Sequence, residues 1–133
     1  MIQGTYIEPE DLTQTILAVV RLAQRRVTII SPVVEEVVLE VIREHAREGV
    51  EIEVRAEGRG HAQMVVADEH VALTTSTSFN SVGTGIGWVE PDEGEEPRVP
   101  NVECGLVVEG VEAVQKLLES ASSFVGPTPR NGR

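Results

Sequence analysis

The chain alternates between two spacings of apolar residues, and this alternation restricts the folds that it can adopt. Residues 10–25 and 32–48 repeat apolar side chains at helical spacing, and residues 111–122 do so again near the end. Residues 27–31 and 50–56 are short runs rich in β-branched residues, the pattern of strands. Helices interleaved with strands predict an α/β fold, with a mixed, largely buried β-sheet flanked by helices.

The composition agrees with a sheet buried between helices. Aromatic residues make up 3% of the 133 residues, so Val, Ile, Leu and Ala must form the core. This length suits one domain, expected over residues 1–125, with a flexible tail at 126–133. Eleven Lys and Arg against 22 Asp and Glu give a formal net charge of −11, a surface that repels nucleic acid as a whole.

The same totals bear on the cellular compartment. One cysteine excludes an internal disulfide and suits a reducing environment. No apolar run reaches membrane-spanning length, and the N-terminus lacks the pattern of a signal peptide. A soluble, cytoplasmic protein is therefore expected. Residues 90–100 form an acidic, proline-bearing segment that we expect to be mobile.

The first two helices have recognisable signals. Ser31 is expected to cap the second helix, with Pro32 at its first position and Gly49 as a left-handed stop. The apolar stripes expected to face the core are Leu12, Ile16, Val19, Val20 and Ala23 in the first helix, and Val34, Val37, Val38, Val41 and Ile42 in the second.

The polar chemistry gathers around residues 61–68. As a strand, this segment places His61 and Gln63 on one face and Asp68 on the other. A turn and a second strand, residues 71–75, follow, and the hydroxyl run Thr74-Thr75-Ser76-Thr77-Ser78 ends the hairpin. A hairpin that sets a histidine beside an amide and hydroxyls predicts an anion or phosphoryl site.

At this point the chain, from residue 4 to residue 125, resembles the phospholipase D superfamily, specifically one half of its two-fold-related catalytic unit. That family has a His-x-Lys-x4-Asp motif, a strand ending in Gly-Ser-x-Asn, and a later strand carrying Asn-x-Glu. His61 and Asp68 match the ends of the first motif at the correct spacing. Ser76 falls on the serine of the second, and Asn101 and Glu103 match the third.

Three departures from the family pattern bear on activity. Gln63 stands at the motif lysine and Thr75 at the glycine. Ser78 stands at the asparagine, unless a slip of two residues brings Asn80 into that position. The connection over residues 57–60 is also short for the family.

The resemblance implies roles for the matching residues. His61 would be the nucleophile that attacks phosphorus, and Glu103 would hold its imidazole, with Asn101 on the same strand face. Ser76 and Ser78 would donate hydrogen bonds to phosphate, and Asp68 would support the turn. The last strand is expected at 101–108, where Cys104 has the opposite parity and should be a small core residue.

Gln63 raises a question of charge. A lysine neutralises phosphate oxygens as charge develops in the transition state, whereas an amide only donates hydrogen bonds. Arg55 or Arg59 can supply the missing charge, because guanidinium suits phosphate. Equally, both can be solvated cations that offset nearby glutamates. His45 and His70 are expected to be exposed, no metal cluster is visible, and the family chemistry needs no cofactor.

Two functions follow from the resemblance. In one, a homodimer brings two His61 side chains together around a phosphate-containing ligand, with catalysis weak or lost; the net charge makes nucleic acid an improbable ligand. In the other, the same dimer is an active phosphodiesterase, of nuclease or phospholipase type, with a phosphohistidine intermediate. Some transcription regulators that sense small molecules carry domains of this type, so another protein chain is a further possible partner. Loss of the lysine and the acidic surface favour the first function. The second is favoured by the residues that match the family pattern, which are His61, Asp68, Ser76, Asn101 and Glu103.

Overall fold

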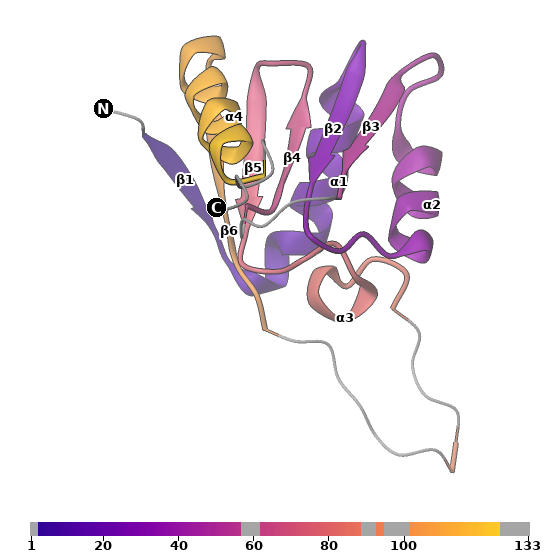
Figure 1. Cartoon of the computed structure of the whole chain (residues 1–133). Helices are drawn as coiled ribbons and strands as arrows, with labels where there is room; N and C mark the ends of the chain where they lie inside the picture. Colours follow the sequence, from indigo (N-terminus) through magenta and orange to yellow (C-terminus); the bar gives the residue numbers. More distant parts are fainter. Residues whose placement is uncertain (1–2, 57–61, 89–92, 95–101, 126–133) are drawn as a thin grey trace, which may run out of the picture.

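A computed structural model of the chain describes residues 3–56, 62–88, 93–94 and 102–125. They form a six-stranded sheet with helices on both faces (Figure 1). Strands β2 and β3 run parallel, and all the remaining neighbouring pairs are antiparallel. The predicted mixed sheet is therefore confirmed. In the order β1-β6-β5-β4-β2-β3 across the sheet, the strands are β1 (Gly4–Ile7), β6 (Gly105–Glu109), β5 (Val71–Thr75), β4 (Met64–Ala67), β2 (Arg26–Ile30) and β3 (Glu51–Arg55).

The helices divide between the two faces of this sheet. The short helix η1 (Pro9–Asp11) leads into α1 (Leu12–Leu22), which covers one face together with α2 (Glu36–His45) (Figure 1). Helix α4 (Val111–Val125) covers the other face, and the single turn α3 (Ser81–Thr84) lies below the sheet in the view of Figure 1. Within the described ranges, no helix has both the length and the apolar character needed to cross a bilayer.

The core follows this layering, because alternate residues of each strand face opposite sides. On the α1 and α2 side, Ile29, Val65 and Leu73 pack with the stripe of α1. On the α4 side, Met64 and Val66 pack with α4. The central strand β4 is therefore buried along its whole length. The predicted stripe of α1 is confirmed, since all five of its residues are buried.

Helix α2 differs from the prediction at both ends. It begins at Glu36, because the hydroxyl of Ser31 donates to the carbonyl of Val33 at 2.6 Å and accepts from the backbone N–H of Phe79 at 3.2 Å, and so does not cap a helix. The helix ends at His45, and Gly49 takes its left-handed conformation, with φ of 84°, in the turn before β3. Val37, expected in the core, is exposed.

Other boundaries also differ from those expected. Strand β1 was not predicted, because its four residues lie at an edge of the sheet and show no buried alternation. Helix α3 falls in residues 79–88, where three glycines favour a loop over a helix. There, a side chain on Gly83 would overlap the hydroxyl of Thr77, so glycine is required. Strands β4 and β6 are shorter than the predicted strands.

Candidate functional site

Four of the predicted site residues gather at one end of the sheet, where β5 ends and β4 and β6 begin. Gln63 immediately precedes β4, Ser76 and Ser78 follow β5, and Glu103 lies two residues before β6. This end is the lower edge of the sheet in Figure 1, beside α3. The antiparallel pairing of β4, β5 and β6 brings these segments together.

Gln63 and Ser78 form one polar pair. The Ser78 hydroxyl donates to Oε1 of Gln63 at 2.7 Å, and both residues are half-buried. The backbone carbonyl of Gln63 accepts from the N–H of Thr75 at 2.9 Å, which continues the β4–β5 ladder by one residue pair. This hydrogen bond fixes the backbone position from which the Gln63 side chain extends. Because Oε1 is used by Ser78, Gln63 can present its NH2 group to a ligand.

Ser76 and Glu103 form a second pair. The Ser76 hydroxyl donates to Oε1 of Glu103 at 2.6 Å and accepts from the backbone N–H of Cys104 at 3.0 Å. The backbone N–H of Ser76 donates in turn to the carbonyl of Cys104 at 3.0 Å. Ser76 is thus tied by backbone and side chain to the segment before β6, which places the Glu103 carboxylate beside the end of β5.

The hydroxyl run divides by residue type, since its threonines bond to backbone carbonyls and its serines to side chains. Thr75 donates to the carbonyl of Thr77 at 2.7 Å, and Thr77 donates to the carbonyl of Ser78 at 2.8 Å, so these hydroxyls shape the backbone. Ser76 and Ser78 direct their hydroxyls to other side chains instead. Two serines of the run therefore belong to the site.

Asn80 has a different role from the one that a two-residue slip would give it. Its Oδ1 accepts from the backbone N–H of Gly83 at 2.7 Å and caps α3. Ser78 lies beside Gln63, which favours the register without a gap. The pattern of Asn before a short polar segment is an N-cap signal that could have predicted α3.

Glu35 links α2 to α3 at this end, a contact that sequence reasoning missed. Its Oε1 accepts from the backbone N–H of Ser81 at 2.9 Å. Hydrogen bonds from the backbone N–H and then the hydroxyl of Ser81 lower the pKa of Glu35 below its ordinary value. No local sequence signal predicts this contact, because 46 positions separate the two residues.

Asp68 lies beyond the opposite end of β4 from Gln63. Its Oδ1 accepts from the backbone N–H groups of Arg25 at 2.9 Å and Arg26 at 3.0 Å, and its Oδ2 accepts from that of Gln24 at 3.0 Å. It does so with φ of 56°, a left-handed conformation that aspartate tolerates better than most residues. Asp68 therefore joins the β4–β5 turn to the connection between α1 and β2.

The ionisation of Asp68 reflects these contacts. Burial by itself raises the pKa of the carboxyl, but hydrogen bonds from the backbone N–H groups of Gln24, Arg26 and Arg25 lower it, as does the charge of Arg25. The net result is a pKa below the ordinary value, because the charged form is the one that these donors stabilise.

Arg55 is not placed to replace the charge of the motif lysine. It pairs in register with Ile30, which faces α4, so its side chain begins on the α4 face of the sheet. There its Nε donates to Glu53 at 3.0 Å. Gln63 alternates with Met64 and so begins on the α1 and α2 face.

The remaining predictions fall into two groups. His61, Arg59 and Asn101 lie outside the described residues, as does the tail at 126–133. Cys104 is half-buried and is not a core residue, His70 is exposed, and the half-buried His45 contacts the carbonyl of Val41 through Nδ1 at 2.9 Å. In the part of the chain that the structure describes, no group of three or more His, Cys, Asp or Glu could hold a metal ion.

Comparison with known proteins places the fold. No protein-family model matches the chain, and no curated protein matches it. Among solved structures it is similar to NucT from Helicobacter pylori, with a TM-score of 0.63 and 8% sequence identity over 93% of this chain and 96% of that one. It is also similar to Nuc from Salmonella typhimurium, a phospholipase D family member, with a TM-score of 0.56 and 14% identity over 93% of each chain. The chain therefore has a phospholipase D-like fold.

Proposed function

We propose that this chain is a phospholipase D-like protein whose site binds a phosphate-containing ligand around His61 at the two-fold axis of a homodimer, with catalysis weak or lost. The observation that carries this proposal is the Gln63–Ser78 pair. It occupies the positions that the family motifs give to lysine and asparagine, and it is neutral.

Charge is the main argument against efficient catalysis. The polar side chains that the structure brings together here are Gln63, Ser76, Ser78 and Glu103, which supply hydroxyls, an amide and one carboxylate. Phosphoryl transfer requires stabilisation of negative charge that develops on the phosphate oxygens, and fixed donors or cations usually supply it. Arg55, the described one of the two arginines expected to replace the lysine, is paired with Glu53 on the other face.

The homodimer follows from the half-site. One chain offers one His61, whereas the family chemistry uses two histidines, one as nucleophile and one as general acid. Apolar side chains are also exposed around this end, because Val33, Val82 and Val102 are 54%, 40% and 82% exposed. In a chain with a net charge of −11, two copies would associate through this apolar surface more readily than through the acidic remainder, where like charges repel.

An active phosphodiesterase remains the second candidate, and the Ser76–Glu103 hydrogen bond favours it. In that reaction an imidazole nitrogen of His61 would bond to phosphorus while the bond to the leaving oxygen breaks. His61 of the partner subunit would protonate that oxygen. Water would then give a proton to the partner's His61 and attack phosphorus, breaking the bond to the imidazole and releasing the phosphate ester and free His61. Glu103 Oε2 could still accept from an imidazole, because Ser76 uses Oε1.

Hydrolysis of bis(p-nitrophenyl) phosphate distinguishes the two functions. We expect the wild-type rate to be near background, because loss of one preorganised electrostatic donor commonly costs about 10²–10³ in rate. Gln63→Lys should raise the rate, and His61→Ala in the Gln63→Lys background is the control that should remove the gain. Sedimentation of the wild-type chain at micromolar concentration should give about twice the chain mass.

Each other outcome has a defined meaning. Vigorous wild-type turnover that His61→Ala abolishes would establish the enzymatic function and point to Arg59 as the charge. A chain that stays monomeric at every concentration would remove the two-histidine site. If Gln63→Lys gives no gain, the site has diverged by more than this residue.

A further inference from the structure

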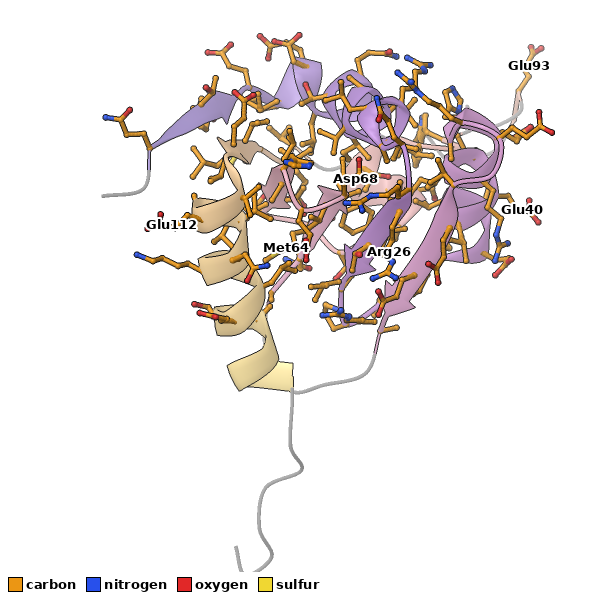
Figure 2. All side chains as sticks on the ribbon, turned by 90° about the horizontal axis from the view of Figure 1, so that it is seen from above. Arg26, Glu40, Met64, Asp68, Glu93 and Glu112 are labelled. Atoms are coloured by element: carbon orange, nitrogen blue, oxygen red, sulfur yellow. The ribbon has the colours of Figure 1, made fainter. Side chains whose placement is uncertain are left out.

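The end of the sheet opposite the candidate site carries a cavity that the proposed function does not use. Its volume is about 400 Å³, within the range of small-molecule sites. Its walls come from the end of α1, the connection into β2 and the β4–β5 turn, and include Leu22, Gln24, Arg25, His70 and Val71. Figure 2 looks onto this end of the molecule, where Asp68 and Arg26 are labelled.

The cavity combines an apolar wall with a cationic one. Leu22 is 53% exposed although it is the last residue of α1, and the half-buried Val71 lines the same cavity. Gln24, Arg25 and His70 supply polar groups on the same cavity. A guanidinium beside an exposed leucine is suited to a ligand with an anionic group and an apolar body.

Arg25 is available for a ligand, whereas its neighbour is not. Arg26 pairs with Glu51 at 3.2 Å and with Glu53 at 3.7 Å. No ion pair within 4.0 Å joins the Arg25 guanidinium to a carboxylate among the described residues. Asp68 also lines the cavity, but both of its oxygens are directed to backbone N–H groups.

We propose that this cavity binds a small amphipathic monocarboxylate, with its carboxylate on Arg25 and its apolar chain against Leu22 and Val71. One guanidinium can take a carboxylate through two parallel hydrogen bonds. A singly charged ligand fits better than a polyanion, because the protein carries a net charge of −11 and Asp68 lies in the same cavity wall. This site is independent of the one around Gln63, so neither proposal depends on the other.

Titration of the ¹⁵N-labelled full chain with sodium hexanoate tests the proposal. We expect saturable shifts of the amides of residues 22–25 and 67–71, and at least about tenfold weaker binding to Arg25→Ala. Arg26→Ala is the matched control and should bind as the wild type does. Hexanamide, which lacks the charge, and acetate, which lacks the apolar chain, should both bind more weakly than hexanoate.

Arg25→Ala removes only the side chain, so the backbone N–H that donates to Asp68 is retained. A dispersed ¹H–¹⁵N spectrum would show that the variant is folded. Equal hexanoate binding by Arg25→Ala and the wild type would overturn the proposal. So would equal affinity for acetate, shifts confined to other residues, or no saturable shift at millimolar hexanoate. His61→Ala should bind hexanoate normally, which separates this site from the phosphate site.

Discussion

The polar side chains at the two ends of β4 form different kinds of hydrogen bond. At the lower end, Gln63 bonds to Ser78, a hydrogen bond between two side chains. At the upper end, Asp68 accepts three hydrogen bonds, all from backbone N–H groups. The backbone around Asp68 depends on that side chain, whereas the backbone around Gln63 is held by the β4–β5 ladder. A side chain that the fold does not require is open to change with function.

This contrast separates two motif positions that look alike in sequence. In the motif that the sequence resembles, Gln63 departs from the pattern and Asp68 keeps it. The aspartate closes a turn and connects α1 to β2, so its loss would affect the fold in any member with this arrangement. The amide at position 63 carries no such structural demand, because the β4–β5 ladder holds the backbone there.

The largest expected effect is on stability, at the Asp68 end. Asp68→Ala removes the acceptor of three backbone N–H groups, and hydrogen bonds to charged groups are each worth about 1.5–3 kcal/mol when buried. Because these groups are partly exposed, we expect a loss of about 2 kcal/mol in the free energy of unfolding. Urea unfolding measures it, and a loss no larger than that of Gln63→Ala would contradict the contrast.

Asp68→Asn is the companion variant. Asparagine tolerates positive φ and keeps Oδ1, which serves Arg25 and Arg26, but its NH2 group faces the N–H of Gln24. Its stability should therefore lie between those of the wild type and Asp68→Ala.

The next effect is the pH dependence of that difference. The folded-state pKa of Asp68 is lowered, so its contribution is fully present above the unfolded pKa, about 3.9, and is lost as pH falls through the lower folded value. The advantage of the wild type over Asp68→Asn should thus shrink steadily below about pH 4. Urea unfolding at a series of pH values measures it, and a difference that stays constant down to pH 2 would mean that the pKa is not lowered.

The elements that the sequence predicts well are those that carry their own pattern. The stripe of α1 follows from spacing alone, because burial on one face leaves a period in the sequence. Strand β1 could not be predicted in this way, since it is exposed and pairs with β6 about a hundred positions later. Ser31 shows a second limit, because its bond to the N–H of Phe79 overrides a local capping signal.

The sequence selects four described residues that lie together at the candidate site, but it does not predict their contacts. The motif spacing selected Gln63, Ser76, Ser78 and Glu103, and the structure brings these four to one end of the sheet. Their pairing depends on the register of β4, β5 and β6, which the spacing of motifs does not encode. The partners of Ser76 and Ser78 lie 27 and 15 positions away. Neither the register of Ser78 against Asn80 nor the face of Arg55 could be assigned before the strands were paired.

A smaller effect is expected from the Gln63–Ser78 pair. Gln63→Ala and Ser78→Ala should each cost under about 1 kcal/mol in the free energy of unfolding, because one half-buried, neutral hydrogen bond contributes roughly 0.5–1.5 kcal/mol. The double variant should cost less than the sum of the two, since both single changes break the same bond. Strict additivity in urea unfolding would show that the two side chains do not interact.

The smallest expected effect is at Glu35, which is at the same end as the candidate site but bonds to backbone as Asp68 does. The backbone N–H of Ser81 donates to the Glu35 carboxylate, so the Ser81 amide should report the ionisation of Glu35. The lowered pKa of Glu35 means that this contact is complete above the ordinary glutamate pKa, about 4.3, and is lost as pH falls through the lower folded value. The Ser81 amide proton shift should follow that titration and become flat in Glu35→Gln. Glu36→Gln is the matched control, because Glu36 faces Arg43 at 3.4 Å and should leave the Ser81 titration unchanged. A Ser81 titration that survives Glu35→Gln would remove the link between α2 and α3, and with it the second example of a backbone-bound carboxylate.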